Sequence, residues 1–165
     1  MAGDFFIRRA TPEDAPGILN CLAAAFEPYR TSYSPGGWLD TILTAETVQQ
    51  RLSSMEILVA VSPDGVVGTI AFAVVDGTEG HLRGMAVLRA WQGRGVAEAL
   101  LQAAQAGLAG QGCARITLDT TEPLQRAMRF YEKHGYRRSG RVSDFFGMRL
   151  HEYAKELEPV NTPRM

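Results

Sequence analysis

The chain has 165 residues, 45% of them hydrophobic, and its 17 lysines and arginines nearly balance its 18 aspartates and glutamates. This length and composition suit one folded domain over residues 1–165 and exclude a chain that is disordered overall. The net charge of −1 gives no basic footprint for nucleic acid, so we expect no nucleic-acid partner.

Cysteines and apolar runs narrow the class of protein further. The two cysteines, Cys21 and Cys113, are too few and too far apart for a zinc cluster or a disulfide framework, which favours a reducing, cytoplasmic setting. The longest apolar stretch, residues 66–75, is too short to cross a bilayer, and we expect no signal peptide before Arg8. We therefore expect a cytoplasmic protein without a metal site and without a membrane partner.

The first half of the chain predicts a strand, two helices and three strands. Thr11 followed by Pro12 is typical of a helix start, and Pro28 marks the end of that helix. The segment 29–38 is rich in Tyr, Ser, Pro and Gly and predicts a loop. The other predicted elements are a strand over 5–9, a helix over 39–52 begun by Asp40 or Thr44, a hairpin of strands over 57–61 and 66–75, and a strand over 81–87.

The second half predicts the order helix, strand, helix, strand, strand. The helices run from residue 96 to about 110 and from Pro123 through Tyr131, and the strands cover 114–119, a stretch from Gly135, and 145–153. Residues 156–165 are polar, with two prolines, and we expect a frayed tail. The complete order, β-α-α-β-β-β-α-β-α-β-β, indicates a mixed α/β or α+β fold with one central sheet.

A glycine-rich turn joins the strand ending at Val87 to the helix that begins near Val96. A helix start leaves its first N–H groups without partners and carries partial positive charge, so this turn suits a phosphate or pyrophosphate. Arg94 adds a fixed positive charge nearby. The dinucleotide fingerprint would need glycine in place of Glu98, and no Gly-Lys-Ser/Thr sequence of a Walker loop is present.

Two blocks carry a resemblance to a known family. Gln92-x-x-Gly95-x-Ala97 resembles the acetyl-CoA pyrophosphate loop of the GCN5-related N-acetyltransferases (GNAT), and residues 127–136 resemble their Ala-x-x-Phe-Tyr-Glu-Lys-x-Gly-Phe segment. The resemblance covers nearly all of the chain. It implies a GNAT-like fold, in which a central, mostly antiparallel mixed sheet is flanked by helices on both faces.

The resemblance also implies a reaction and a cosubstrate. An acetyl group would pass from acetyl-CoA to a primary amine of a small molecule or protein by direct attack. The alternative is a non-catalytic acyl-CoA-binding or regulatory domain. The cofactor-binding residues implied are Met85, Ala86 and Val87 through their backbones, for the pantetheine arm and thioester, and Gln92, Gly93, Arg94, Gly95, Val96 and Ala97 for the pyrophosphate. On this interpretation a side chain on Gly93 or Gly95 would obstruct the loop.

Two residues are candidates for catalysis. Tyr131 stands where the family places the acid that protonates the departing thiolate, although a core tyrosine is the alternative. His81 is the candidate base, because an imidazole of near-neutral pKa can accept the proton of an ammonium group, and an exposed turn histidine is equally compatible with the sequence. Glu79 and Glu122 are weaker candidates. Leu124 departs from the family, which often has a CoA-contacting asparagine there.

Aromatic residues suggest where the acceptor binds and how the chain associates. Phe26, Tyr29, Tyr33 and Trp38 fall where the family builds its acceptor lobe, and they could instead pin a loop. The apolar pair Phe145 and Phe146 is compatible with a homodimer and equally with a core strand.

Overall fold

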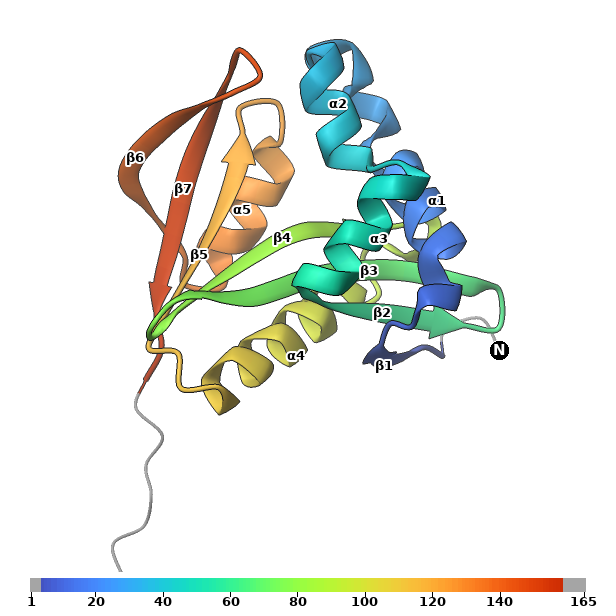
Figure 1. Ribbon diagram of the computed structural model, residues 1–165, viewed down its shortest axis with the longest axis horizontal. Helices are drawn as coiled ribbons and strands as arrows, with labels where there is room; N and C mark the ends of the chain where they lie inside the picture. The colour runs from blue at the N-terminus through green and yellow to red at the C-terminus, as the bar shows by residue number, and fades with distance from the viewer. Residues whose placement is uncertain (1–3, 159–165) are drawn as a thin grey trace, which may run out of the picture.

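The computed structural model describes residues 4–158 and contains one seven-stranded sheet of order β1-β2-β3-β4-β5-β7-β6 (Figure 1). Neighbouring strands pair antiparallel, except β4 and β5, which are parallel. This arrangement confirms the expected mixed, mostly antiparallel sheet. The strands are β1 (Phe6–Arg9), β2 (Glu56–Ser62), β3 (Gly65–Asp76), β4 (Glu79–Val87), β5 (Arg115–Thr121), β6 (Arg137–Phe145) and β7 (Met148–Glu156).

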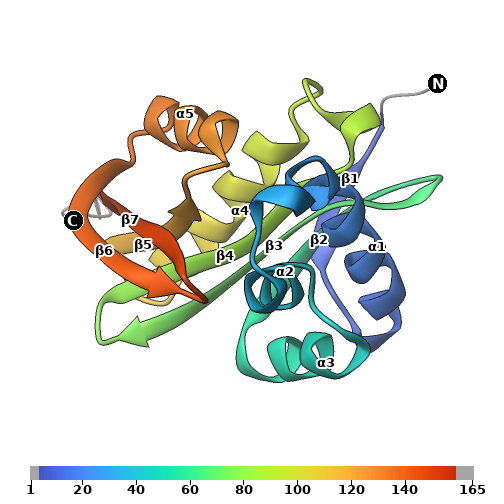
Figure 2. The ribbon, with the colours of Figure 1, turned by 90° about the horizontal axis from the view of Figure 1, so that it is seen from above.

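Helices cover both faces of the sheet (Figures 1 and 2). One face carries α1 (Ala15–Phe26), α2 (Pro35–Ile42) and α3 (Ala45–Ser54), and the other carries α4 (Val96–Gly110) and α5 (Gln125–Lys133). Strand residues alternate between the two cores, as a period of two requires. In β3, Ile70 and Phe72 pack with α4 and α5, while Ala71 packs with α1 and α3. No helix among residues 4–158 is long and apolar enough to cross a membrane.

The segment between α1 and β2 is where the structure differs from the sequence-based expectation. The predicted loop over 29–38 contains a 3₁₀ helix (Glu27–Ser32), in which Pro28 lies in the first turn, and the first half of α2. Ser34 caps α2 by accepting a hydrogen bond from the Gly37 amide. A Cβ on Gly36 would lie 2.5 Å from the ring of Phe146, so the glycines serve close packing against the β6–β7 hairpin.

The helix predicted over 39–52 is two helices. Leu43 takes a φ of 65° and ends α2, because its side chain is buried among α1 and α3 and the chain must turn to place it there. Thr44 then caps α3, where its hydroxyl accepts from the Thr47 amide, so the predicted start at Thr44 is confirmed and Asp40 lies inside α2.

The strand predicted over 145–153 begins three residues later than expected. Phe145 ends β6 and pairs with Met148 of β7, so Phe146 and Gly147 form a two-residue hairpin turn with positive φ at both positions. The strand then continues to Glu156, the first residue of the expected tail. The remainder of that tail, 159–165, lies outside the described residues.

The sheet opens between β4 and β5. Their pairing stops at Leu82 and Leu118, although β4 continues to Val87 and β5 to Thr121. The register of β3 against β4 shifts in the same place, where Gly84 and Met85 lie opposite one residue of β3 and Gly84 has a φ of 65°. This bulge bends β4 away from β5 and creates the gap in which the site lies.

Candidate active site

The first cavity, of about 490 Å³, lies in the gap between β4 and β5. Nearly all residues assigned to the cofactor from the sequence line it together with Tyr131: Met85, Ala86, Val87, Gln92, Gly93, Gly95, Val96 and Ala97. Arg94 does not line the cavity, and its guanidinium lies 4.9 Å from the centre of the Trp91 ring. The strand end, the turn and the start of α4 therefore face one space.

The turn presents backbone N–H groups to this cavity. Gly95 is the N-cap of α4 and has no side chain to occupy the first amides of the helix. Gly93 and Gly95 have φ of 77° and 83°, in the region that favours glycine. A Cβ at either position would meet no protein atom within 4 Å, so within the protein the glycines are required by backbone conformation rather than by space.

Side-chain and packing contacts hold this turn in place. The Gln92 Nε2 donates to the Val87 carbonyl at 3.2 Å, and its Oε1 accepts from Arg126 at 2.7 Å. A Cβ on Gly68 of β3 would lie 2.8 Å from Val96, so the first residue of α4 packs directly on the sheet. The turn is thereby tied to the end of β4, to β3 and to α5.

Tyr131 reaches the first cavity from α5. It is 8% exposed, and its ring packs edge-on against Phe130 and Tyr136 at centroid distances of 5.5 and 5.8 Å. Burial raises the pKa of the Tyr131 phenol above its ordinary value of about 10. The hydroxyl is therefore protonated at neutral pH and able to donate.

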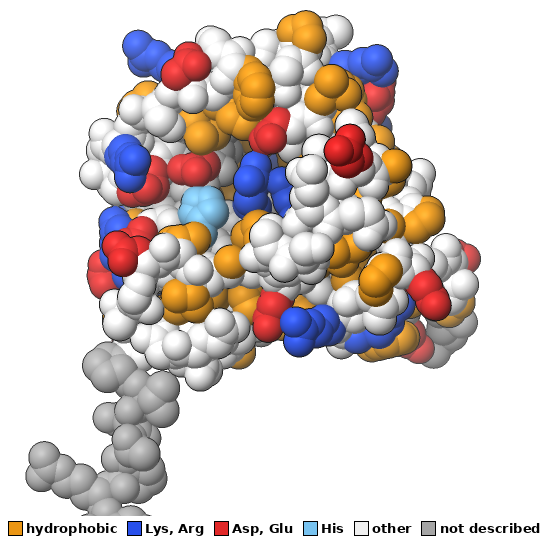
Figure 3. All heavy atoms as spheres, viewed as in Figure 1, with side chains coloured by type: hydrophobic (Ala, Val, Ile, Leu, Met, Phe, Trp, Pro, Cys, Tyr) orange, Lys and Arg blue, Asp and Glu red, His pale blue; other side chains and the backbone are white. Residues whose placement is uncertain are grey.

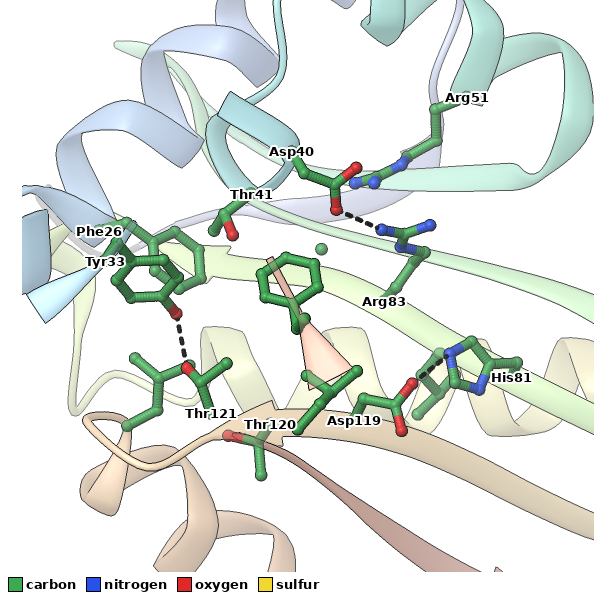
Figure 4. Close-up of a pocket in the computed structure, with 15 residues that line it drawn as sticks. Phe26, Tyr33, Asp40, Thr41, Arg51, His81, Arg83, Asp119, Thr120 and Thr121 are labelled. Carbon is green, nitrogen blue, oxygen red and sulfur yellow. Dashed lines mark hydrogen bonds and ion pairs between the residues drawn. The ribbon is translucent and has the colours of Figure 1, made fainter. Parts of the chain in front are cut away.

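A second cavity, of about 320 Å³, lies on the side of α2 and α3 (Figure 4). His81 lines this cavity and not the first. The two cavities share a wall made of Phe26, Leu82, Arg83, Gly84, Asp119, Thr120 and Leu124. Molecules held in the two cavities would therefore meet where β4 and β5 separate.

His81 has a partner on each ring nitrogen. Its Nδ1 lies 2.8 Å from the Thr117 hydroxyl, which in turn lies 3.4 Å from the Gly80 carbonyl, and its Nε2 lies 3.5 Å from Asp119. Because Thr117 can donate to Gly80, we assign the proton of the neutral ring to Nδ1 and the lone pair to Nε2. Burial lowers the pKa of His81, an effect that Asp119 opposes and Arg83 reinforces. The neutral base is thus favoured at neutral pH.

Comparison with known proteins identifies the family. A protein-family description, the acetyltransferase (GNAT) family, matches residues 22–136. The chain is also 33% identical, over 152 residues, to an aminoglycoside N(6')-acetyltransferase type 1 of Stenotrophomonas maltophilia. That match covers 84% of this chain and 90% of the relative. The chain belongs to the GNAT family.

Solved structures share this GNAT fold. The PaiA N-acetyltransferase from Thermoplasma acidophilum, solved with coenzyme A, has a TM-score of 0.77 at 16% identity, and the match covers 93% of this chain and 99% of that one. Ard1 from Thermoplasma volcanium has a TM-score of 0.76 at 19% identity, with 94% and 99% covered. The family membership supports an N-acetyltransferase that uses acetyl-CoA, as predicted, and nothing in the comparisons supports the non-catalytic alternative.

The described residues of this GNAT protein fit acetyl-CoA. Open amides at the start of α4 suit the pyrophosphate, and the unpaired end of β4 offers backbone groups along the same cavity. Leu124, in place of the family's asparagine, lines the wall between the cavities as an apolar residue. The two weaker candidates lie outside both cavities: Glu79 pairs with Arg115 at 3.4 Å and Glu122 with His151 at 3.3 Å.

Several polar residues of the second cavity were missed from the sequence. Asp119 follows the apolar run of β5 at the point where that strand leaves β4, and this position at a strand end was the available signal. Asp40 lies in α2 and Arg51 in α3, which the sequence predicted as a single helix. No local pattern indicated that the two side chains would line one cavity.

Of the aromatic residues predicted for the acceptor lobe, some line a cavity and one only packs against them. Phe26 and Tyr33 line the second cavity, and Phe26 and Tyr29 line the first. The Tyr33 hydroxyl is 2.8 Å from that of Thr121, which links the 3₁₀ segment to β5. Trp38 stacks edge-on against Tyr33 at 6.2 Å and lines neither cavity.

Proposed function

We propose that this enzyme acetylates the primary amine of a small molecule, with acetyl-CoA in the first cavity and the acceptor in the second. The observation that carries the proposal is the shared wall between them, at Leu82–Gly84 and Asp119–Thr120. It lets an amine approach a thioester from the opposite face of the sheet. The volume of the second cavity, about 320 Å³, and its lining by aromatic side chains favour a small molecule over a protein amino group.

Acetyl-CoA binding is assigned mainly to the backbone. The amides of Gln92–Ala97 would hold the pyrophosphate, with the Arg94 side chain adding positive charge at the edge of the loop. The backbone of Met85, Ala86 and Val87 would hold the pantetheine arm and stabilise the oxyanion, because this end of β4 makes no hydrogen bonds to β5.

His81 is assigned as the general base. The acceptor amine is an ammonium ion near neutral pH, and Nε2 of His81, directly or through one water, would accept its proton while Asp119 attracts the cation. The amine nitrogen then attacks the carbonyl carbon, a C–N bond forms, and the C–S bond breaks. Asp119 stabilises the imidazolium produced.

Tyr131 is assigned as the general acid. It lines the cofactor cavity and would donate its phenolic proton to the CoA sulfur as negative charge collects there during C–S bond cleavage. The proton held on His81 passes to solvent, and the second proton that the nitrogen loses replaces the one that Tyr131 gave, so both residues return to their starting states. No covalent enzyme intermediate is required.

An aminoglycoside is a second candidate acceptor, because the curated relative is named for that activity.

We also propose a cytoplasmic location and a homodimer. The homodimer would use the edge strand β6 and the turn that follows it, where Val142 and Phe146, respectively, are about half exposed. Light scattering on the purified protein tests it, and a monomer at all concentrations would reject it.

The first experiment is a thermal shift with acetyl-CoA, CoA and NAD in parallel. A ligand present at about 100 times its Kd adds about 2.7 kcal/mol to the free energy of unfolding. We expect stabilisation by acetyl-CoA and CoA but not by NAD, followed by thiol release in an amine panel. Absence of any shift with acetyl-CoA would remove the loop assignment and the roles of His81 and Tyr131 together.

A further inference from the structure

The acceptor cavity contains two arginines and one neighbouring carboxylate at one end. Arg83 comes from β4, Arg51 from α3 and Asp40 from α2, and the three side chains converge in Figure 4. Figure 3 shows basic side chains recessed in the middle of this face, with acidic side chains around them. Asp40 accepts from Arg83 at 3.0 Å. This end of the cavity therefore carries a net positive charge, which would not attract the ammonium group of an acceptor amine.

Arg51 is the less satisfied of the two arginines. Among residues 4–158 the Arg51 guanidinium makes no hydrogen bond or ion pair, whereas the Arg83 guanidinium pairs with Asp40. Burial and the nearby Arg83 lower the pKa of Arg51 to about 10, while Asp40 opposes this shift. A guanidinium with five donors in a cavity wall is therefore available to a ligand.

The backbone makes room for this guanidinium. A Cβ on Gly84 would lie 2.7 Å from Arg51 Nη1, so the bulge glycine of β4 leaves the space that the arginine fills. This contact brings a charge from α3 to the same wall that separates the acceptor from acetyl-CoA. Arg51 is thus placed by the bulge that opens the sheet.

We infer that the acceptor is an amine that also carries a carboxylate, with the carboxylate held by Arg51 and Arg83 and the amine directed toward Asp119 and His81. This inference rests on the proposed function. The two arginines and Asp40 sum to one positive charge, which one carboxylate neutralises, and planar guanidinium groups match a planar carboxylate. Phe26, Phe145 and Leu150 line the same cavity and suit an apolar body.

Two other acceptor classes fit this end of the cavity less well. A phosphate dianion would leave an excess of negative charge beside Asp40. A polycationic aminoglycoside would bring ammonium groups against two guanidinium groups, and like charges in a partly desolvated cavity repel. Both classes therefore belong in the test as competing acceptors.

The test measures thiol release from acetyl-CoA with matched acceptors: L-phenylalanine and L-leucine, their amides, the corresponding amines without the carboxylate, phosphoethanolamine and kanamycin. The amides are the stringent comparison. Their amino groups are less basic than those of the amino acids, so a larger fraction is neutral and able to attack the thioester, and charge recognition must overcome that advantage. We expect kcat/KM for the amino acids to exceed that for amide and amine by about tenfold or more. A preference for an uncharged analogue, phosphoethanolamine or kanamycin would overturn the carboxylate assignment.

Variants connect this preference to the arginines. Arg51→Gln should lower the ratio of kcat/KM for the amino acid to kcat/KM for the amine about tenfold, while Arg51→Lys should retain part of the preference. Arg129→Gln, on the exposed surface of α5, is the control. An unchanged amino acid/amine ratio in a folded Arg51→Gln that acetyl-CoA still stabilises would reject the role of Arg51. Thiol release with no acceptor at all, despite stabilisation by acetyl-CoA, would instead reject the proposed function itself.

Discussion

The two cavities are built in different ways. The acetyl-CoA cavity is lined mainly by a strand end, a glycine turn and a helix start that are consecutive in the sequence, and its proposed contacts are backbone groups. The acceptor cavity collects charged side chains from α2, α3, β4 and β5, which the chain brings together from distant positions. Cofactor binding is thus assigned to local backbone geometry, and acceptor choice to tertiary placement of side chains.

The largest effect is expected at Tyr131, the proposed proton donor in the acetyl-CoA cavity. Tyr131→Phe should lower kcat about 100-fold or more while leaving acetyl-CoA binding nearly intact, because it removes general acid catalysis without changing the ring. Tyr136→Phe is the matched control. It removes a 2.8 Å hydrogen bond to Gln105 and should cost about 1 kcal/mol of stability but no turnover. Equal kcat in both variants would contradict the assignment.

The next effect tests the base on the acceptor side. His81→Gln should lower kcat/KM about 100-fold. In the wild type, activity should fall at acidic pH as His81 becomes protonated, with a midpoint below the ordinary histidine value of about 6.5 because burial lowers its pKa. Asp119→Asn removes a charge that favours the imidazolium, so the acidic limb should move to lower pH. If the acidic limb of the pH profile stays at the same pH in Asp119→Asn, Asp119 does not influence the protonation of His81.

A smaller effect is expected in the cofactor turn. Gly95→Ala places a Cβ on a residue with φ of 83°, which should cost about 1–2 kcal/mol of stability and weaken acetyl-CoA binding about tenfold. Gly110 lies in the last turn of the same helix, and a Cβ there would enter open space, so Gly110→Ala should be neutral or slightly stabilising. Thermal shifts with and without acetyl-CoA measure both changes. Unchanged binding by Gly95→Ala would show that the turn tolerates another conformation.

The smallest effect is expected at Asp14, which lies outside both cavities and contributes to stability rather than to activity. Asp14 accepts from Arg8 at 2.7 and 2.9 Å and from the Thr11 amide at 2.8 Å, and the hydrogen bonds from Arg8 do most to lower its pKa. Asp14→Asn should therefore cost about 1 kcal/mol at neutral pH.

The pH dependence of this difference follows from the lowered pKa. The stabilisation by Asp14 is complete above the unfolded-state pKa of about 3.9 and is lost as pH falls through the lower folded-state value. Urea unfolding at several pH values should show the two proteins converging in acid. Asp76→Asn, exposed at the end of β3, should change stability by less than about 0.5 kcal/mol. A pH-independent difference would assign the cost to lost geometry rather than to charge.

Much of the fold could be predicted because its signals are local. The hairpin of β2 and β3, the Thr44 cap and the glycine turn before α4 each follow from neighbouring residues, and the structure has them where expected. The α2 segment could not be predicted in this way. Its glycines suggested a loop. In the structure they are needed because the β6–β7 hairpin, more than a hundred residues later in the sequence, packs too closely against α2 to leave room for a side chain.

The family, the cosubstrate and the turn at the first cavity could be predicted from the amino-acid sequence, because consecutive residues set the backbone conformation and the open amides of that turn. The acceptor cavity depends on how the folded chain packs. Arg51, Asp40 and Asp119 come from separate elements to one cavity, beside the bulge at Gly84, and the interactions of charged side chains depend on distance in space rather than in sequence.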